Sequence, residues 1–277
     1  MKYKKYSVFN PANFYTFFKC TNEDKKNLLD FQLFLLNSGS YKKIIESPRF
    51  APSNTWLDWL SETYIGFSSN QMLIKSGHKM YNSYDPFFFN VHKEKSDFST
   101  LKLILILIRR LFFRKITSGN KEKNEFNKVY NIEFDIFEEN IFNANPGAFT
   151  RCYEIYNLSS SKKDHEVLIE IGAGSCLNLS IYKYKHNSKG LIIDLPETIY
   201  MGYAVLKNLF PESKVLLPHQ VEDLLQSETY SNDILNNYDF IFMLPTQIDF
   251  ISDSSVDRAF NMASFQEMNI EVVNNYI

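Results

Sequence analysis

Short apolar runs alternate with stretches of helical length in the second half of the chain. The runs that predict strands are VLIEI (167–171), GLIIDL (190–195), KVLL (214–217), YDFIFMLP (238–245) and VDRAFNMASF (256–265). Residues 196–210 place apolar side chains on one helical stripe, and Pro196 suits a first helical turn. Because strands that alternate with helices form parallel sheets, this pattern predicts a doubly wound, Rossmann-like α/β fold.

The first part of the chain has a different pattern, which predicts mainly helices. We expect one helix over residues 21–39, with Thr21 as its N-cap, and another over residues 53–67, where Trp56 and Tyr64 share a helical face. The polar, charge-dense stretch 117–125 is the best candidate for a linker. We therefore divide the chain into a mainly helical region, 1–140, suited to bind an acceptor or cap a site, and an α/β domain, 141–277.

Two further stretches admit alternatives. Residues 132–158 are helical or partly extended in pattern on either side of a turn at 145–147, and residues 145–149 form either a plain Pro-Gly turn or a flap over a bound cofactor. The apolar run 101–113 is interrupted by charged residues and is too short to span a bilayer. It predicts a buried helix or strand, with a basic amphipathic helix on a membrane surface as the alternative.

Composition and charge narrow the class of protein. The 277 residues are 44% hydrophobic, which is enough for a sizeable core. Thirty basic residues against 32 acidic ones leave a net charge of -2, so no basic excess indicates a nucleic-acid partner. The three cysteines are widely spaced and residues 1–15 lack the apolar stretch of a signal peptide, so we expect a reducing, cytoplasmic location.

The candidate chemistry begins where the predicted strand 167–171 leads into the sequence GAGSC (172–176). Gly172 and Gly174 permit backbone conformations that a Cβ would forbid, and they let a ligand approach the main chain closely. Asp194 follows about twenty residues later, at the end of the next predicted strand. A carboxylate there can accept hydrogen bonds from ribose hydroxyls. The combination predicts a cofactor of the adenosine type, with a tight turn and a capping Asp as the alternative.

The third glycine of the dinucleotide fingerprint is replaced by Leu177, which favours a cofactor without a pyrophosphate, such as S-adenosylmethionine. The stretch EIGAGS, followed by Asp194, resembles motif I and the acidic loop of class I S-adenosylmethionine-dependent methyltransferases. The stretches IIDLPETIYMGYAVLKNLFP and DSSVDRAFNMASFQEM are similar to the sugar O-methyltransferase family of bacterial polysaccharide pathways. The resemblance covers residues from about 145 to the end.

This resemblance implies a set of cofactor contacts. Asp194 would bind the ribose, Leu195 would line the adenine slot, and Glu170 would lie near the ammonium of the methionine part. In the segment LPTQID, Gln247 is the first polar contact for the adenine edge and Asp249 the second, although either also suits a turn cap. The implied cofactor-binding residues are Glu170, Gly172, Ala173, Gly174, Asp194, Leu195, Gln247 and Asn261. Cys176 stands where these enzymes often have a glycine, and we interpret it as a packing residue.

The acceptor end of the site follows the strand predicted at 256–265. Methyl transfer from a sulfonium is an in-line displacement, and the enzyme usually removes the proton of the attacking hydroxyl. Glu267 is the first candidate for this base and Gln266 for a substrate contact, while His219 is a second catalytic candidate. The alternatives are an ordinary helix-start glutamate and a solvated loop histidine. No acidic or histidine cluster has a spacing that indicates a metal.

The resemblance implies an S-adenosylmethionine-dependent O-methyltransferase whose acceptor is a hydroxyl of a sugar or glycan precursor. A full domain of this class has further strands after residues 256–265, so we expect a sheet that is incomplete at its C-terminal side, with residues 256–262 as an exposed edge. A truncated product or fragment would have that form. The alternative functions are a catalytically inactive methyltransferase-like scaffold and an NAD(P)-dependent oxidoreductase.

Overall fold

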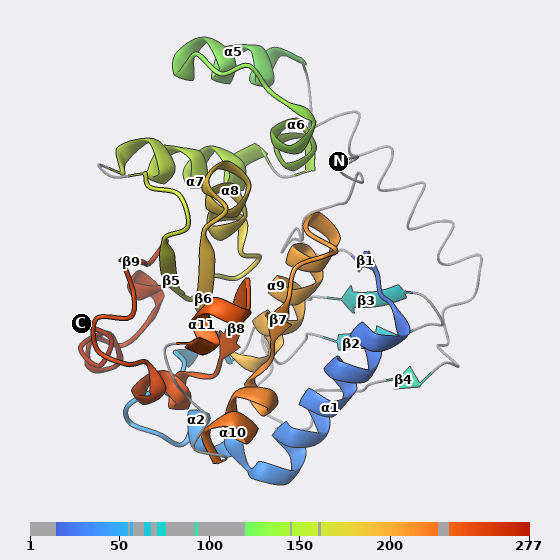
Figure 1. Cartoon of the computed structure of the whole chain (residues 1–277), viewed down its shortest axis with the longest axis vertical. Coiled ribbons are helices and arrows are strands. Elements are labelled where there is room, and N and C mark those ends of the chain that lie inside the picture. The colour runs from blue at the N-terminus through green and yellow to red at the C-terminus, as the bar shows by residue number, and fades with distance from the viewer. Residues whose placement is uncertain are drawn as a thin grey trace.

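A computed structural model of the chain describes residues 15–54, 56–57, 64–67, 71–75, 92–93, 120–144, 146–159, 162–226 and 233–277 (Figure 1). The predicted run 101–113 lies outside these residues. The described part has α/β architecture, with a larger parallel sheet in the second half of the chain and a smaller sheet in the first half.

The larger sheet has five strands in the order β7-β8-β6-β5-β9, and every neighbouring pair is parallel. Its strands are β5 (Val167–Ile171), β6 (Lys189–Ile193), β7 (Val215–Leu216), β8 (Phe240–Met243) and β9 (Arg258–Phe260). Each of them overlaps a predicted run, and β6 begins one residue before its run. The chain passes from β5 through β6 to β7 at the far edge, comes back to β8 between β7 and β6, and then crosses to the other side of β5, so the strand order reverses at β5. In open parallel sheets, ligands bind at the carboxyl ends of the strands beside such a reversal.

Both faces of this sheet are covered, as the nearly continuous apolar strand sequences require. The helices that connect and cover the strands are α8 (Leu177–His186), α9 (Pro196–Leu209), α10 (Pro218–Gln226) and α11 (Asp233–Asn237). Leu168 and Ile192 pack with α8 and α9 in one apolar cluster, whereas Ile169 and Ile193 belong to a second cluster with residues of α10 and α11. The alternation follows from the period of two along a strand.

Helix α9 differs from its prediction in being buried around its whole circumference, from Pro196 to Leu206, not on one stripe. It lies between the larger sheet and the smaller one (Figure 1). Helices that are surrounded by protein need no polar face. The smaller sheet and α9 therefore share one core with the parallel sheet.

The first part of the chain contains, besides its helices, a four-stranded sheet with the order β1-β3-β2-β4. The strands are β1 (Tyr15–Lys19), β2 (Tyr64–Phe67), β3 (Gln71–Lys75) and β4 (His92–Lys93). The helix predicted over 53–67 is thus wrong at Tyr64–Phe67, which pairs antiparallel with β3. Ile65 and Phe67 are buried two positions apart, so a strand buries them on one face of the sheet.

Two helices in this part follow from local signals. Helix α1 (Asn22–Ser38) confirms the helix expected over 21–39: Thr21 accepts a hydrogen bond from the N–H of Asp24, and the Asp24 carboxylate accepts one from Thr21 in return. Gly39 ends the helix in the left-handed region, with φ of 64°. It leads directly into α2 (Ser40–Ile45).

The middle of the chain is helical, but its joints differ from the prediction. Helices α5 (Asn120–Tyr130), α6 (Ile136–Ala144) and α7 (Pro146–Leu158) follow one another. The expected linker 117–125 is wrong from Asn120 onward, because α5 begins there. Pro146 and Gly147 lie in the first turn of α7, so neither a free turn nor a flap forms, and Phe149 is buried in an aromatic cluster with Phe126.

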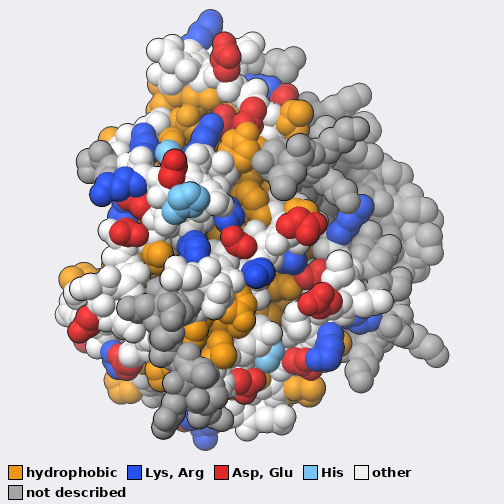
Figure 2. Space-filling view, in the orientation of Figure 1, with side chains coloured by type: hydrophobic (Ala, Val, Ile, Leu, Met, Phe, Trp, Pro, Cys, Tyr) orange, Lys and Arg blue, Asp and Glu red, His pale blue; other side chains and the backbone are white. Residues whose placement is uncertain are grey.

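The segments after β8 complete the edge of the larger sheet. They comprise the 3-10 helix η1 (Pro245–Phe250), strand β9, the 3-10 helix η2 (Phe265–Glu267) and helix α12 (Ile270–Val273). As expected, β9 is an edge strand of this sheet. In the described part of the chain no helix combines the length and apolarity that crossing a bilayer requires. Basic and acidic side chains are interspersed over the described part of the face seen in Figure 2.

Candidate functional site

A bend with two glycines follows β5 at the point where the strand order reverses. Gly172 has φ of +68° and Gly174 has φ of +56°, which is the left-handed region that favours glycine. The N–H of Gly172 donates to the carbonyl of Ile193, at 2.8 Å, and so continues the pairing of β5 with β6. The bend therefore stays attached to the neighbouring strand as it turns toward α8.

The two glycines are required for different reasons. A Cβ at Gly172 would lie 2.3 Å from Oγ of Ser264, so the loop after β9 occupies the space that a side chain would need. A Cβ at Gly174 would meet nothing within 4 Å. Gly172 thus permits close packing of two loops, whereas Gly174 leaves open space on the side of the cleft that it lines.

The carboxylate of Asp194 lies directly against this bend. Its Oδ2 accepts a hydrogen bond from the N–H of Gly174, and its Oδ1 accepts one from the N–H of Leu195, both at 2.7 Å. Burial raises the pKa of the Asp194 carboxyl above its usual range, and hydrogen bonding from the Thr198 side chain and from these N–H groups opposes the shift. A carboxylate has about four acceptor sites. Each oxygen therefore keeps acceptor capacity for a ligand.

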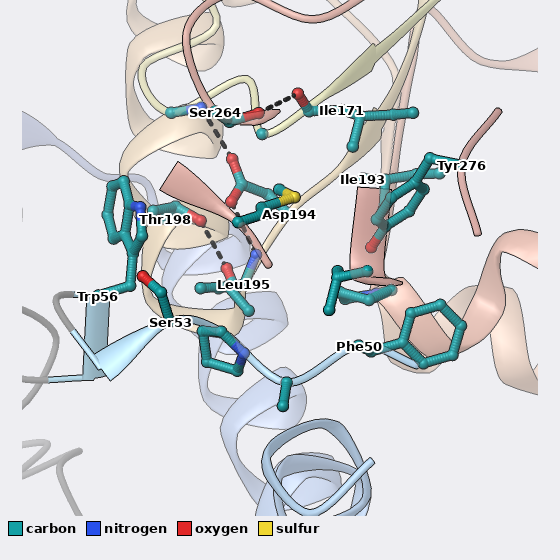
Figure 3. A pocket seen from close by; sticks show the side chains of 17 residues that line it. Phe50, Ser53, Trp56, Ile171, Ile193, Asp194, Leu195, Thr198, Ser264 and Tyr276 are labelled. Carbon is teal, nitrogen blue, oxygen red and sulfur yellow. Dashed lines mark hydrogen bonds between the residues drawn. The ribbon is translucent and has the colours of Figure 1, made fainter. Parts of the chain in front are cut away.

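A cleft that is partly open to solvent lies across the carboxyl ends of β5 and β6. The bend and Asp194 both line it (Figure 3). Three parts of the chain supply the other lining residues, which are mostly apolar. Residues at the strand ends and in the loops that follow are Ile171, Ile193, Leu195, Thr198 and Pro245; the segment after α2 gives Phe50, Ala51, Pro52, Ser53 and Trp56; the segment after β9 gives Ser264, Met268, Val272 and Tyr276.

The two outer segments contact each other across the cleft. The rings of Phe50 and Tyr276 have centroids 6.2 Å apart, and the side-chain amide of Asn275 donates to the carbonyl of Arg49 at 3.1 Å. Arg49 in turn makes a bidentate ion pair with Asp249, at 2.7 and 2.8 Å. These contacts fix residues 49–53 against the parallel sheet, although the segment belongs to the first part of the chain.

Four of the predicted cofactor residues line the cleft together: Gly172, Gly174, Asp194 and Leu195. Their convergence follows from the parallel pairing of β5 with β6, which brings Ile171 beside Ile193 and so brings the two following segments together. The other predicted residues lie elsewhere or at the rim.

Glu170 and Ala173 are buried and are not among the cleft residues. Glu170 is one position before the end of β5, so it points to the face opposite that of Ile171. Burial, together with the nearby charge of Asp194, raises the pKa of the Glu170 carboxyl to about 8. A pKa in that range keeps the group largely protonated at neutral pH.

Gln247 and Asn261 hold backbone in place. The Gln247 carbonyl oxygen accepts from the N–H of Leu244 at 2.9 Å, and its amide donates to the carbonyl of Pro218 at 3.0 Å. The Asn261 amide donates to the carbonyl of Ile171 at 2.8 Å. Neither side chain is a lining residue, so the structure gives both a role in fixing the loops beside the cleft.

The two catalytic candidates have different surroundings. His219 packs on α1, with its ring 6.2 Å from that of Phe31, and burial lowers the pKa of its imidazole. It does not line the cleft. Glu267 is exposed and its Oε2 accepts a hydrogen bond, at 2.7 Å, from the indole N–H of Trp56, which does line the cleft. Glu267 thus lies at the rim, whereas His219 lies away from it. Gln266 is exposed beside Glu267.

Sequence reasoning missed the outer wall of the cleft, chiefly Phe50, Trp56 and Tyr276. The sequence carries no motif around these residues, and the helical spacing assigned to Trp56 indicated a core position. The only available signal is aromatic residues beside prolines and serines in 47–56, which is too common to locate a site.

The residues that replace glycines in the bend are packed in the core. Cys176, with φ of +55°, precedes the first residue of α8 and is fully buried, and burial raises the pKa of its thiol well above the usual value. This agrees with a packing role. Leu177, at the place of the third glycine in a dinucleotide fingerprint, is also buried in the main apolar cluster.

Among the described residues no group of three or more His, Cys, Asp or Glu side chains is arranged to hold a metal ion. Comparison of the chain with protein-family models, with curated proteins and with solved structures gave no match. The functional proposal below therefore depends on the residues of the cleft and on the sequence motifs.

Proposed function

We propose that this protein is an S-adenosylmethionine-dependent methyltransferase that acts on a hydroxyl of a sugar or glycan precursor. One observation carries the proposal: the glycine bend and the Asp194 carboxylate are in direct contact, at 2.7 Å, and line the same cleft. The sequence motif placed these groups only at the ends of two strands. Their shared cleft is what an adenosyl ligand that spans both strands requires.

The lining residues fit the parts of such a cofactor. The free acceptor capacity of Asp194 suits two ribose hydroxyls, and the apolar surfaces of Leu195, Ile193 and Pro245 suit an adenine ring. The open space at Gly174 leaves room for the methionine part near the main chain. When bound, the cofactor supplies a methyl group on a positively charged sulfur.

Charge favours this cofactor over a dinucleotide. The described cleft residues include the Asp194 carboxylate but no lysine, arginine or histidine. A cationic sulfonium is attracted to such a site, whereas a pyrophosphate would bring negative charges without a partner. Leu177, buried in the core, also fills the position that a dinucleotide fingerprint leaves to glycine.

At the acceptor end, Glu267 is the group at the cleft rim that can take a proton. With the cofactor bound, the acceptor oxygen would take the methyl group as the methyl–sulfur bond breaks, and the Glu267 carboxylate would receive the hydroxyl proton. The acceptor class, a sugar, derives from the sequence resemblance.

The test is calorimetric titration with S-adenosylhomocysteine and with NAD. We expect the first to bind and the second to bind far more weakly. Asp194→Ala removes hydrogen bonds from two hydroxyls to a charged acceptor, which amounts to about 3 kcal/mol, or about a hundredfold in Kd. Asp253→Ala is the matched control, because it removes an exposed carboxylate that is not a cleft residue.

Three outcomes would contradict parts of the proposal. Unchanged affinity for S-adenosylhomocysteine in folded Asp194→Ala would remove the ribose assignment. Tighter binding of NAD would favour the oxidoreductase. Binding of S-adenosylhomocysteine without methyl transfer to any tested sugar would favour the inactive scaffold.

A further inference from the structure

Trp56 and Glu267 meet at the rim of the cleft although 211 positions separate them in the sequence. The indole Nε1–H of Trp56 donates to Oε2 of Glu267 at 2.7 Å. Trp56 belongs to the segment after α2, and Glu267 ends η2, which follows β9. A side chain that lines the cleft therefore holds a carboxylate beside it.

This pair lies on a different side of the cleft from Tyr276. In Figure 3, Trp56 and Tyr276 stand on opposite sides of Asp194. Glu267 follows β9, which neighbours β5 on the side away from β6. If Asp194 and the residues after β6 and β8 hold the adenosyl part, the Trp56 side of the cleft remains for the second substrate.

The side of the cleft near Trp56 carries an aromatic ring, hydroxyl groups and carboxylates. Ser53 and Ser264 line the cleft together with the indole, and the two carboxylates at or near it are Asp194 and Glu267. The described cleft residues supply no cationic side chain to this region, and Arg49, next to the lining segment, is paired with Asp249. A phosphate or carboxylate on a ligand would be repelled here without compensation.

We propose that Trp56, Glu267 and the serines beside them form the acceptor subsite, and that its ligand is an uncharged ring that carries hydroxyl groups. The inference rests on the proposed function and narrows its acceptor to neutral sugars, as opposed to sugar phosphates, sugar acids or nucleotide sugars. The indole offers an apolar face to the C–H face of the ring, and its N–H positions the Glu267 carboxylate toward a ring hydroxyl. Trp56 is thus a positioning residue, and Glu267 is the residue that touches the hydroxyl.

Tryptophan fluorescence can report on the subsite directly, because the chain contains only two tryptophans, Trp56 and Trp59. In the Trp59→Phe variant, saturated with S-adenosylhomocysteine, emission comes from Trp56 alone. The probes are methyl glycosides of glucose, galactose, mannose and rhamnose, with glucose 6-phosphate and glucuronate as charged counterparts. We expect at least one neutral glycoside to change the emission saturably, and the charged probes to bind about tenfold more weakly or worse.

The same titration separates failure of this inference from failure of the methyltransferase proposal. Equal or tighter binding of a charged probe, or no saturable response to any neutral glycoside, overturns the neutral-sugar subsite. If S-adenosylhomocysteine binds in that experiment, the cofactor assignment stands regardless. If it does not bind, the methyltransferase proposal fails first, and the subsite fails with it.

Substitutions separate packing from positioning. With a glycoside that binds, Trp56→Ala should weaken glycoside binding by calorimetry about tenfold, while the Kd for S-adenosylhomocysteine changes less than about threefold. Trp56→Phe keeps a ring but loses the N–H, so its methyl-transfer kcat should fall about tenfold at unchanged KM, as Glu267 loses its orientation. A wild-type kcat in folded Trp56→Phe would exclude the positioning role, and wild-type glycoside affinity in folded Trp56→Ala would exclude the subsite.

Discussion

Gly172 should be the least replaceable residue of the bend, for a steric reason that the structure supplies. An alanine at this position keeps φ at +68°, a conformation that costs an L-residue about 1–2 kcal/mol. Its Cβ would also lie 2.3 Å from Oγ and 2.4 Å from Cβ of Ser264, so the loop after β9 must move. Overpacking of this kind costs about 1–3 kcal/mol. Gly172→Ala should therefore destabilise the fold by about 2–5 kcal/mol.

Gly174 provides the matched control, since its φ of +56° imposes the same backbone cost while its Cβ would meet nothing within 4 Å. Gly174→Ala should lose only about 1–2 kcal/mol. The difference between the two variants isolates the overlap with Ser264. Because both Oγ and Cβ of Ser264 cause that overlap, Ser264→Gly should rescue Gly172→Ala, whereas Ser264→Ala should rescue it only in part.

Urea unfolding of the single and double variants measures these terms as a double-mutant cycle. We expect a coupling of about 1–3 kcal/mol between Gly172→Ala and Ser264→Gly, in the direction of rescue. Ser264→Gly alone is also destabilising, because the Ser264 hydroxyl donates to the carbonyl of Ile171 at 3.0 Å. Equal stability of Gly172→Ala and Gly174→Ala, or a cycle without coupling, would refute the steric reasoning.

Three further predictions concern the free energy of unfolding. Gly202→Ala should lower the free energy of unfolding in urea by about 1–3 kcal/mol, because its Cβ would lie 2.7 Å from Sγ of Cys176. Adding Cys176→Ala should recover part of that loss. No recovery would contradict the packing role of the thiol. The raised pKa of Glu170 means that folding stability is lost as pH rises from about 4.5 through about 8. The unfolding free energy of Glu170→Gln should therefore fall less steeply over that range, with a slope that differs from the wild-type slope by up to about 1.4 kcal/mol per pH unit. Parallel curves of unfolding free energy against pH for the two proteins would refute the buried-acid account. The pKa of His219 is lowered, so its effect is opposite: folding stability is lost as pH falls below about 6.5. In His219→Phe the thermal unfolding midpoint should therefore fall less steeply as the pH is lowered. An unchanged dependence on pH would argue against this account.

Local signals gave reliable predictions where a segment's own residues fix its conformation. The cap at Thr21 and the left-handed stop at Gly39 define α1 from within the segment, and Pro196 marks the start of α9. The helix expected over 53–67 failed at Tyr64–Phe67, because pairing with β3 outweighed helical spacing. Residues 120–125 failed in the other direction, since a polar stretch that suits a linker also forms the first turns of α5.

The sequence by itself determined the parallel α/β pattern and the meeting of the glycine bend with Asp194, because parallel strands bring their carboxyl ends to one edge of a sheet. Only the tertiary structure decided what faces those groups. Trp56 and Tyr276 reach the cleft from segments far apart in the chain, and no spacing within either segment encodes their position beside the bend. The strand ends follow from hydrogen bonding that repeats along the backbone, whereas the outer wall depends on how separate segments pack, which is set by the shapes of side chains distant in sequence.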